Sequence, residues 1–175
     1  MKSIIIFLCV AYSVFSQAPA SLQSEVNRLY TASHDIDITA LSEMLCTSDP
    51  DAYAKLDSHF QNDDQKFRYV FTNAKYNYSP PKIIDGKTYF VINFRNVVRV
   101  TYFNPIDAAA MQLALKEKFA AQAITYDKAR NAFMITYTAR MIAIQDQGWK
   151  FAFVDATMPE IETCVSDSVR KELGL

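Results

Sequence analysis

The sequence predicts an α+β domain in which N-terminal helices pack on a curved antiparallel sheet and a short helical tail ends the chain. Three observations lead to this fold class. Apolar residues recur at helical spacing between residues 21 and 60, and from residue 67 the pattern changes to alternation. Turn signals, and not helices, separate most of the later strands, which favours antiparallel connections over βαβ units.

The first three elements are expected to be helices. Leu22, Val26 and Leu29 repeat at helical spacing and mark the first helix. A second helix is expected over residues 37–45, where an acidic residue is available as N-cap, and a third, short one over residues 51–60. Together these helices supply the layer that covers the sheet.

Strands are expected over residues 67–79 and 87–103, which are rich in aromatic and β-branched side chains. Residues 85–86, Asp-Gly, give a turn signal between them. The second run is too long for a flat strand, so a bend or bulge is expected near residues 95–96.

A fourth helix is expected after this long strand. Asn104 would be its N-cap, Pro105 its first helical residue and Asp107 an acid in its first turn. A hairpin over residues 124–144 and a last strand over residues 149–155 complete the expected sheet.

The chain after the last strand is expected to be helical. Residues 157–160, Thr-Met-Pro-Glu, have the form of a capping box that would start a short helix. A final helix carries Val165, Val169 and Leu173 on one stripe and ends at Gly174.

Residues 1–16 have the parts of a secretory signal peptide: Lys2, an apolar run of 12 residues from Ile4 to Phe15, and small residues before Gln17. The run is shorter than the roughly 20 residues that a membrane-spanning helix needs. We therefore expect cleavage before Gln17, a single α+β domain over residues 17–175, a secreted or periplasmic location and no membrane anchor after cleavage.

Two cysteines, Cys46 and Cys164, remain when Cys9 leaves with the signal. An oxidising compartment favours a disulfide between them. The other interpretation, two buried thiols on helix faces, stays open at this stage.

Composition and spacing exclude several classes of site. The chain has 18 basic and 19 acidic residues and no basic block, so nucleic acid is not an expected partner. No calcium loop, zinc spacing or cofactor motif is present, and we predict no catalytic residue, metal or cofactor. His34 and His59 are expected at helix ends or in loops, where a pair of His34 with Asp35 is better explained as a solvated turn.

The segment DIDITAL at residues 35–41 and the terminal hairpin ending in GWKF at residues 148–151 resemble the nuclear transport factor 2-like (cystatin-like) superfamily. The segments YDKARNAFMITYTARMIAI and SVRKELGL also look like small secreted Bacteroidetes proteins of unassigned function. The resemblance implies a curved sheet that forms a cone with a cavity. The long run at residues 87–103 and the tail after residue 155 depart from the family's minimal pattern. Members include dehydratases, isomerases, ligand binders and interaction modules, so the fold does not select a function.

Aromatic residues are the most unusual part of the composition, with 12 Phe, 10 Tyr and 1 Trp. Most are expected in the core, but rings on strands also suit a cavity for an apolar or amphipathic ligand. The candidates for lining such a cavity are Tyr69, Phe71, Phe94, Tyr137 and Trp149.

The leading hypothesis is a non-catalytic binding or interaction domain with a small apolar ligand or a protein partner. The alternatives are a small isomerase or dehydratase that uses a cavity carboxylate or His, and a structural subunit that forms a homodimer through its sheet. Asn93, Arg95, Arg99 and Arg140 are expected to make a polar sheet face. For that face we favour solvation or a dimer contact over an anion site.

Overall fold

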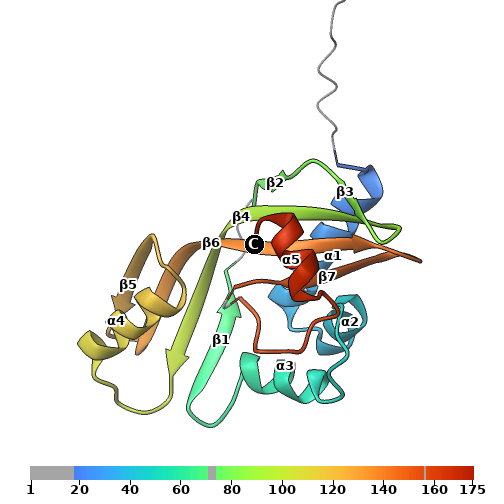
Figure 1. The fold of residues 1–175 in the computed structure, drawn as a ribbon. Coiled ribbons are helices and arrows are strands. Elements are labelled where there is room, and N and C mark those ends of the chain that lie inside the picture. The colour runs from blue at the N-terminus through green and yellow to red at the C-terminus, as the bar shows by residue number, and fades with distance from the viewer. Residues whose placement is uncertain (1–17, 71–73, 156) are drawn as a thin grey trace, which may run out of the picture.

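A computed structural model describes residues 18–70, 74–155 and 157–175 and confirms the α+β class. Its five helices and seven-stranded antiparallel sheet follow the expected order, with three helices first and a short helix last. Long strands cross the middle of the molecule (Figure 1). The predicted signal peptide, residues 1–16, lies outside the described residues. No helix in the described part of the chain is long and apolar enough to cross a membrane.

The elements have the following bounds. The helices are α1 (Ala20–Asp35), α2 (Ile38–Met44), α3 (Ala52–Phe60), α4 (Ala108–Lys118) and α5 (Asp167–Leu173). The strands are β1 (Gln65–Tyr69), β2 (Tyr76–Tyr78), β3 (Lys82–Ile84), β4 (Lys87–Tyr102), β5 (Ala123–Asp127), β6 (Ala132–Gln145) and β7 (Trp149–Phe153).

The two long strands β4 and β6 form the centre of the sheet. They pair in one unbroken register, from Thr88 opposite Gln145 to Thr101 opposite Ala132. A bend or bulge was expected near residues 95–96, and this register leaves no bulge there. A long strand twists continuously, and here the other side of β4 is shared by three short partners, β1, β2 and β3, each with its own register.

Alternation along β4 and β6 separates the sheet into two faces. The inner face is apolar and is covered by α1, α2, α3 and α4, which together form the main hydrophobic core. Among the described residues, the outer face is covered where α5 and the tail before it pack on the far end of β4, β6 and β7. There Val165 and Val169 contact Ile142 and Ile144 in a second, smaller core.

Two of the expected helix starts differ from the structure. Helix α4 begins one turn later than predicted, because the Asp107 carboxylate accepts hydrogen bonds from the backbone N–H groups of Ala109 and Ala110. The helix predicted from the capping box at residues 157–160 does not form. The Thr157 hydroxyl is buried and bonded to other side chains, so it is not available as a cap.

The predictions for Asp85–Gly86 and for Gly174 are confirmed. Asp85 and Gly86 have positive φ angles of 50° and 76° and join β3 to β4 in a two-residue hairpin. Gly174 ends α5 in the left-handed conformation with φ 79°.

Candidate functional site

The inner face is the place where a ligand cavity was expected, and the cavity found beside α1 is very small. Tyr69 and Phe94 line a cavity of about 10 Å³ next to Tyr30 on α1. A single water molecule needs roughly 10–15 Å³. Within the described residues, the inner face thus has room for about one water and for no larger molecule at this point.

Ring packing fills this space. Tyr69 meets Tyr30 edge to face with centroids 5.9 Å apart, and Phe94 lies 6.3 Å from the same ring. Tyr137 packs 5.1 Å from Phe119, beside the end of α4. The expected lining residues therefore contact other rings of the core.

The other two candidates lie elsewhere. Trp149 begins β7 at the far end of the sheet, packs 5.9 Å from Phe90 and donates from Nε1 to Ser21 Oγ at 3.3 Å. Phe71 lies outside the described residues. Tyr69 and Phe94 are thus brought to one cavity, whereas Tyr137 and Trp149 do not line it.

The buried hydroxyl groups of the inner face have hydrogen-bond partners. Tyr137 donates to Thr157 Oγ1 at 3.0 Å and accepts from Asn96 Nδ2 at 3.0 Å, while Tyr69 donates to the Thr157 carbonyl at 3.1 Å. Burial raises the pKa of Tyr69 and of Tyr137 above the ordinary tyrosine value. Both phenols therefore stay protonated and serve the packing of the loop after β7.

Asp155 fixes the start of that loop. Its Oδ1 accepts from the Thr157 N–H at 2.8 Å and from the Thr157 hydroxyl, and its Oδ2 accepts from the Arg140 N–H. Burial raises the pKa of Asp155, and these hydrogen bonds oppose that shift. Both carboxylate oxygens are thus engaged within the protein itself.

His59 is the residue whose surroundings the sequence did not reveal. It lies in the last turn of α3 with its ring 4.5 Å from Phe67 and 5.4 Å from Phe60. Its Nε2 is buried without a hydrogen-bond partner in the described structure. Burial lowers the pKa of His59 to about 4, with a further contribution from the charge of Lys118 and an opposing backbone hydrogen bond at Thr157. The imidazole is therefore neutral at pH 7.

His34 ends α1 as expected, and its Nδ1 lies 2.8 Å from Asp35 Oδ1 on the exposed side of the helix. Neither residue of this His–Asp pair lines the inner cavity. The two histidines thus differ: one is solvated and the other is enclosed by rings.

His59 and Asp155 line the same open hollow, which we call the loop hollow. It has a volume of about 570 Å³, and Lys118 and Arg170 also line it. This size lies within the range of about 300–1,000 Å³ typical of ligand pockets. A neutral imidazole and a carboxyl of raised pKa are the kinds of group used in general acid–base catalysis. Here, however, Nε2 is enclosed and the carboxylate is held by its own loop.

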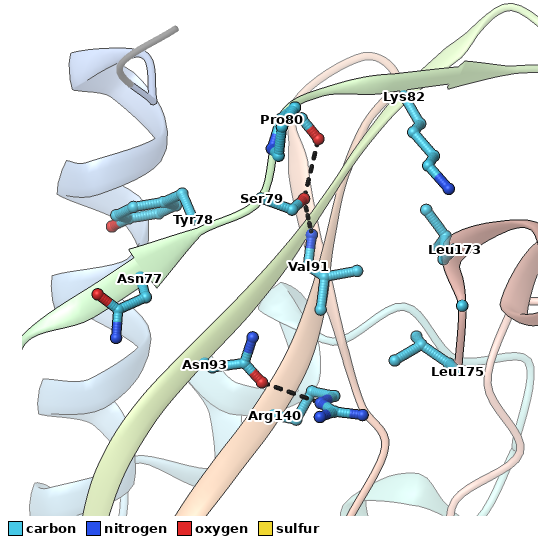
Figure 2. Close-up of a pocket in the computed structure, with 11 residues that line it drawn as sticks. Asn77, Tyr78, Ser79, Pro80, Lys82, Val91, Asn93, Arg140, Leu173 and Leu175 are labelled. Carbon is cyan, nitrogen blue, oxygen red and sulfur yellow. Dashed lines mark hydrogen bonds between the residues drawn. The ribbon is translucent and has the colours of Figure 1, made fainter. Parts of the chain in front are cut away.

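A second hollow, the tail hollow, lies on the outer face beside the chain's last residues (Figure 2). Its volume is about 390 Å³. Arg140 Nε donates to Asn93 Oδ1 at 2.9 Å across β4 and β6, and Leu175 lies beside this pair (Figure 2). Lys82 Nζ donates to the Glu172 carbonyl and so ties β3 to α5.

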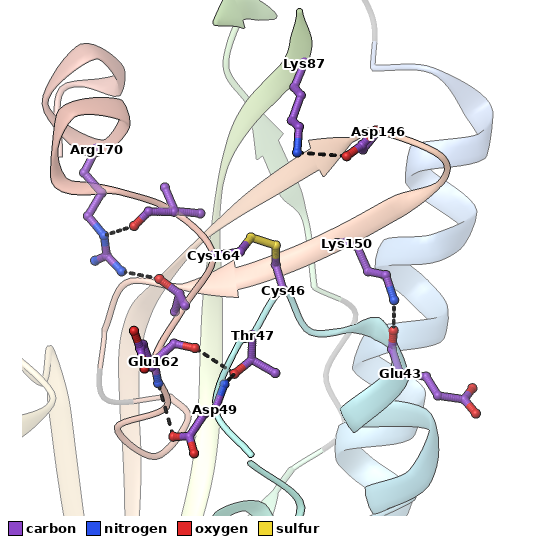
Figure 3. Close-up of a disulfide and its surroundings, with 12 residues drawn as sticks. Glu43, Cys46, Thr47, Asp49, Lys87, Asp146, Lys150, Glu162, Cys164 and Arg170 are labelled. Carbon is purple, nitrogen blue, oxygen red and sulfur yellow. Dashed lines mark hydrogen bonds and ion pairs between the residues drawn. A yellow bond between two sulfur atoms is a disulfide. The ribbon is translucent and has the colours of Figure 1, made fainter. Parts of the chain in front are cut away.

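Cys46 and Cys164 form the predicted disulfide, with their Cα atoms 5.4 Å apart (Figure 3). Backbone hydrogen bonds join the same two segments, from Cys164 N–H to the Cys46 carbonyl at 3.1 Å. Thr47 Oγ1 also donates to the Glu162 carbonyl at 2.7 Å. The disulfide thus fastens the chain after α2 to the tail that precedes α5.

The described residues contain no group of three or more His, Cys, Asp or Glu side chains that could hold a metal ion. No model of a known protein family matches this chain, and no curated protein matches it either.

Proposed function

We propose that this protein is a secreted or periplasmic, non-catalytic interaction domain that binds its partner on its surface. One observation carries the proposal: the cavity beside Tyr30, Tyr69 and Phe94 on the inner face measures about 10 Å³, whereas the loop and tail hollows on the surface measure about 570 and 390 Å³. A ligand of ordinary size would have to displace rings of the core. The surface can accept a partner without that cost.

The compartment rests on two features that support each other. Residues 1–16 have the pattern of a signal peptide, and the disulfide between Cys46 and Cys164 is a bond that persists in oxidising compartments. The resemblance to the nuclear transport factor 2-like superfamily stays a prediction, and interaction modules are among the functions that it would allow.

Native mass spectrometry tests the proposal. The protein is exported with its own leader, purified without detergent and compared with a sample that was unfolded and refolded in lipid-free buffer. We expect both samples to have the mass of the polypeptide alone. A stoichiometric apolar molecule that is present in the exported sample and lost on refolding would contradict the proposal in favour of an enclosed ligand.

A small isomerase or dehydratase is the second candidate, because His59 and Asp155 line one open hollow. The protein would be incubated in D2O with enolisable ketones and 3-hydroxyacyl thioesters, and exchange followed by NMR. If the hypothesis holds, His59→Gln and Asp155→Asn each slow exchange at least about 100-fold, while His34→Gln does not. Exchange that is absent, or indifferent to these substitutions, ends this hypothesis for both substrate classes.

A further inference from the structure

The uncovered part of the outer face carries a cluster of arginines that we call the arginine face: Arg68, Arg95, Arg99 and Arg140. The strand registers bring them together. Arg68 on β1 is directly opposite Arg99 on β4, and Arg140 on β6 is opposite Asn93, one same-face position from Arg95. Because side chains alternate along a strand, all four belong to the face opposite the buried core.

These charges have few counterions within the described structure. Arg95 and Arg99 are exposed, and their side chains take part in no hydrogen bond or ion pair within the described residues. Arg68 donates to the carbonyls of Phe60 and Phe67 at 2.7 and 2.6 Å. Burial and the charge of Arg99 lower its pKa. Arg140 has a nearby carboxylate, Asp155.

Such a cluster costs stability, because like charges directly opposite each other on a sheet repel. The cost is not an effect of overall charge, since the full chain has a net charge of −1. It arises because acidic and basic side chains are concentrated in different segments of the chain. Residues 18–64 carry 2 basic and 9 acidic side chains, whereas residues 65–155 carry 13 basic and 6 acidic ones. The helical layer is acidic and the sheet is basic.

Apolar and hydroxyl groups lie between the arginines. Val97 stands between Arg95 and Arg99 on the same face of β4, and Met134 on β6 is opposite Arg99; both are half-buried. Thr138 is opposite Arg95. Arg and Met are both enriched in protein–protein interfaces. An anionic glycan or free phosphate would use the cations alone, whereas a polypeptide can use the apolar groups as well.

We propose that the arginine face binds an acidic segment of another protein in extended conformation. This inference rests on the proposed function, of which it names the partner class. Guanidinium groups match carboxylates in a two-pronged geometry. Arg95 and Arg99 are four residues apart on one strand, which corresponds to about 13 Å. Carboxylates four residues apart on an extended partner have the same spacing, with an apolar residue midway over Val97.

A second copy of this chain is a poorer occupant. A symmetric dimer through this face would bring arginines toward arginines, with no carboxylate in the centre of the described face to receive them. The acidic helical layer of another copy could contact the face only head to tail, and such contacts do not close into a dimer.

Fluorescence anisotropy with a labelled peptide tests the proposal. The probe repeats Glu-Thr-Val-Thr three times and ends in Glu, and its neutral partner has Gln in place of Glu. We expect saturable binding of the acidic probe alone. The double variant Arg95→Glu/Arg99→Glu should weaken it by about tenfold or more. The matched variant Lys128→Glu/Arg130→Glu, in the exposed β5–β6 turn, should bind within about twofold of the natural protein.

Three results would overturn the proposal. The first is no binding of the probe, or binding that the Arg95→Glu/Arg99→Glu change leaves intact. The second is a sulfated glycan, heparin, that binds through Arg95 and Arg99 when the peptide does not. The third is sedimentation that shows head-to-tail assembly of the protein alone, abolished by the same variant. None of these results bears on the mass measurement above, so this inference can fail while the proposed surface function stands.

Discussion

Neighbouring residues on β4 show how differently the two faces of the sheet are built. Asn96 is fully buried and hydrogen-bonded to Tyr137. Arg95 is exposed, and within the described structure its side chain has no hydrogen-bond or ion-pair partner. Two consecutive residues of one strand thus lie on opposite faces. On the inner face polar groups are hydrogen-bonded within the protein, and on the outer face charged groups are exposed to solvent. The inner face stabilises the fold, whereas the exposed charges of the outer face are available to a binding partner.

The largest expected effect concerns the disulfide, which links the layer on the inner face to the tail on the outer one. The double variant Cys46→Ala/Cys164→Ala removes a loop constraint with a sequence separation of 118. For a loop of about 100 residues the chain-entropy model gives about 4.7 kcal/mol. We expect a loss of about 4–5 kcal/mol in the free energy of unfolding, measured with urea.

The control is the natural protein in reductant, which should unfold at the same urea concentration as the double variant. A loss of less than about 1 kcal/mol would show that the hydrogen bonds around the bridge, and not the covalent link, hold the two segments together.

The second prediction is a pH dependence that originates on the inner face. The pKa of His59 is lowered from 6.5 to about 4, so below pH 6.5 the unfolded chain binds a proton that the folded chain does not. The contribution of His59 to the free energy of unfolding should therefore be fully present above pH 6.5. The free energy of unfolding should fall by up to about 3 kcal/mol as the pH drops to 4. Urea unfolding of His59→Gln should show a shallower pH dependence, and that of His34→Gln an unchanged one. Equal slopes for His59→Gln and the natural protein would refute this origin.

A third prediction removes one hydroxyl from the inner face. Tyr137→Phe deprives Asn96 of its acceptor and Thr157 of a donor, both in a dry environment. The expected loss is about 2 kcal/mol, measured by thermal or urea unfolding. Tyr53→Phe is the matched control, because that ring is 54% exposed, and it should leave stability unchanged. If both variants unfold alike, the buried network adds nothing to stability.

The smallest effect is expected on the outer face and has the opposite sign. Arg99→Thr relieves the repulsion on Arg68 directly across the strand pair. It should raise the free energy of unfolding by about 0.5 kcal/mol at low salt, and the gain should vanish near 1 M salt. Arg130→Thr, which breaks an exposed ion pair with Asp127, should not stabilise. Destabilisation by Arg99→Thr would mean that the arginine face contributes to folding after all.

Local rules were enough for most of the fold. Helical spacing predicted α1 and the last helix, Asp-Gly predicted the β3–β4 hairpin, and the expected compartment predicted the bridge between Cys46 and Cys164. The two failed helix starts have different causes, one a partner distant in sequence and the other a competing cap nearby. Thr157 has the form of a cap but is bonded to Tyr137 on β6. Asn104 was replaced as cap by Asp107, whose carboxylate accepts from two N–H groups.

The candidate sites were less predictable because they also depend on partners distant in sequence. His59 lies in the last turn of a short helix, a position that is usually solvated, and its packing against Phe67 from β1 depends on tertiary structure. Alternation placed Arg95 and Arg99 on a polar face, but it could not show that Arg68 lies opposite Arg99, because register is a property of strand pairs. No local signal in the sequence distinguishes a filled inner face from an open one.

The bridge between Cys46 and Cys164 has a consequence for how damage to this protein would be detected. All seven described strands lie between the two cysteines, so the chain and the disulfide form one covalent ring that contains the sheet. The segment with α1 and α2 leaves this ring at Cys46, and the segment with α5 leaves it at Cys164. A protease that cuts a single loop inside the ring opens it without releasing a fragment. The cut molecule would keep its full mass, apart from one added water, until a reductant separates the pieces.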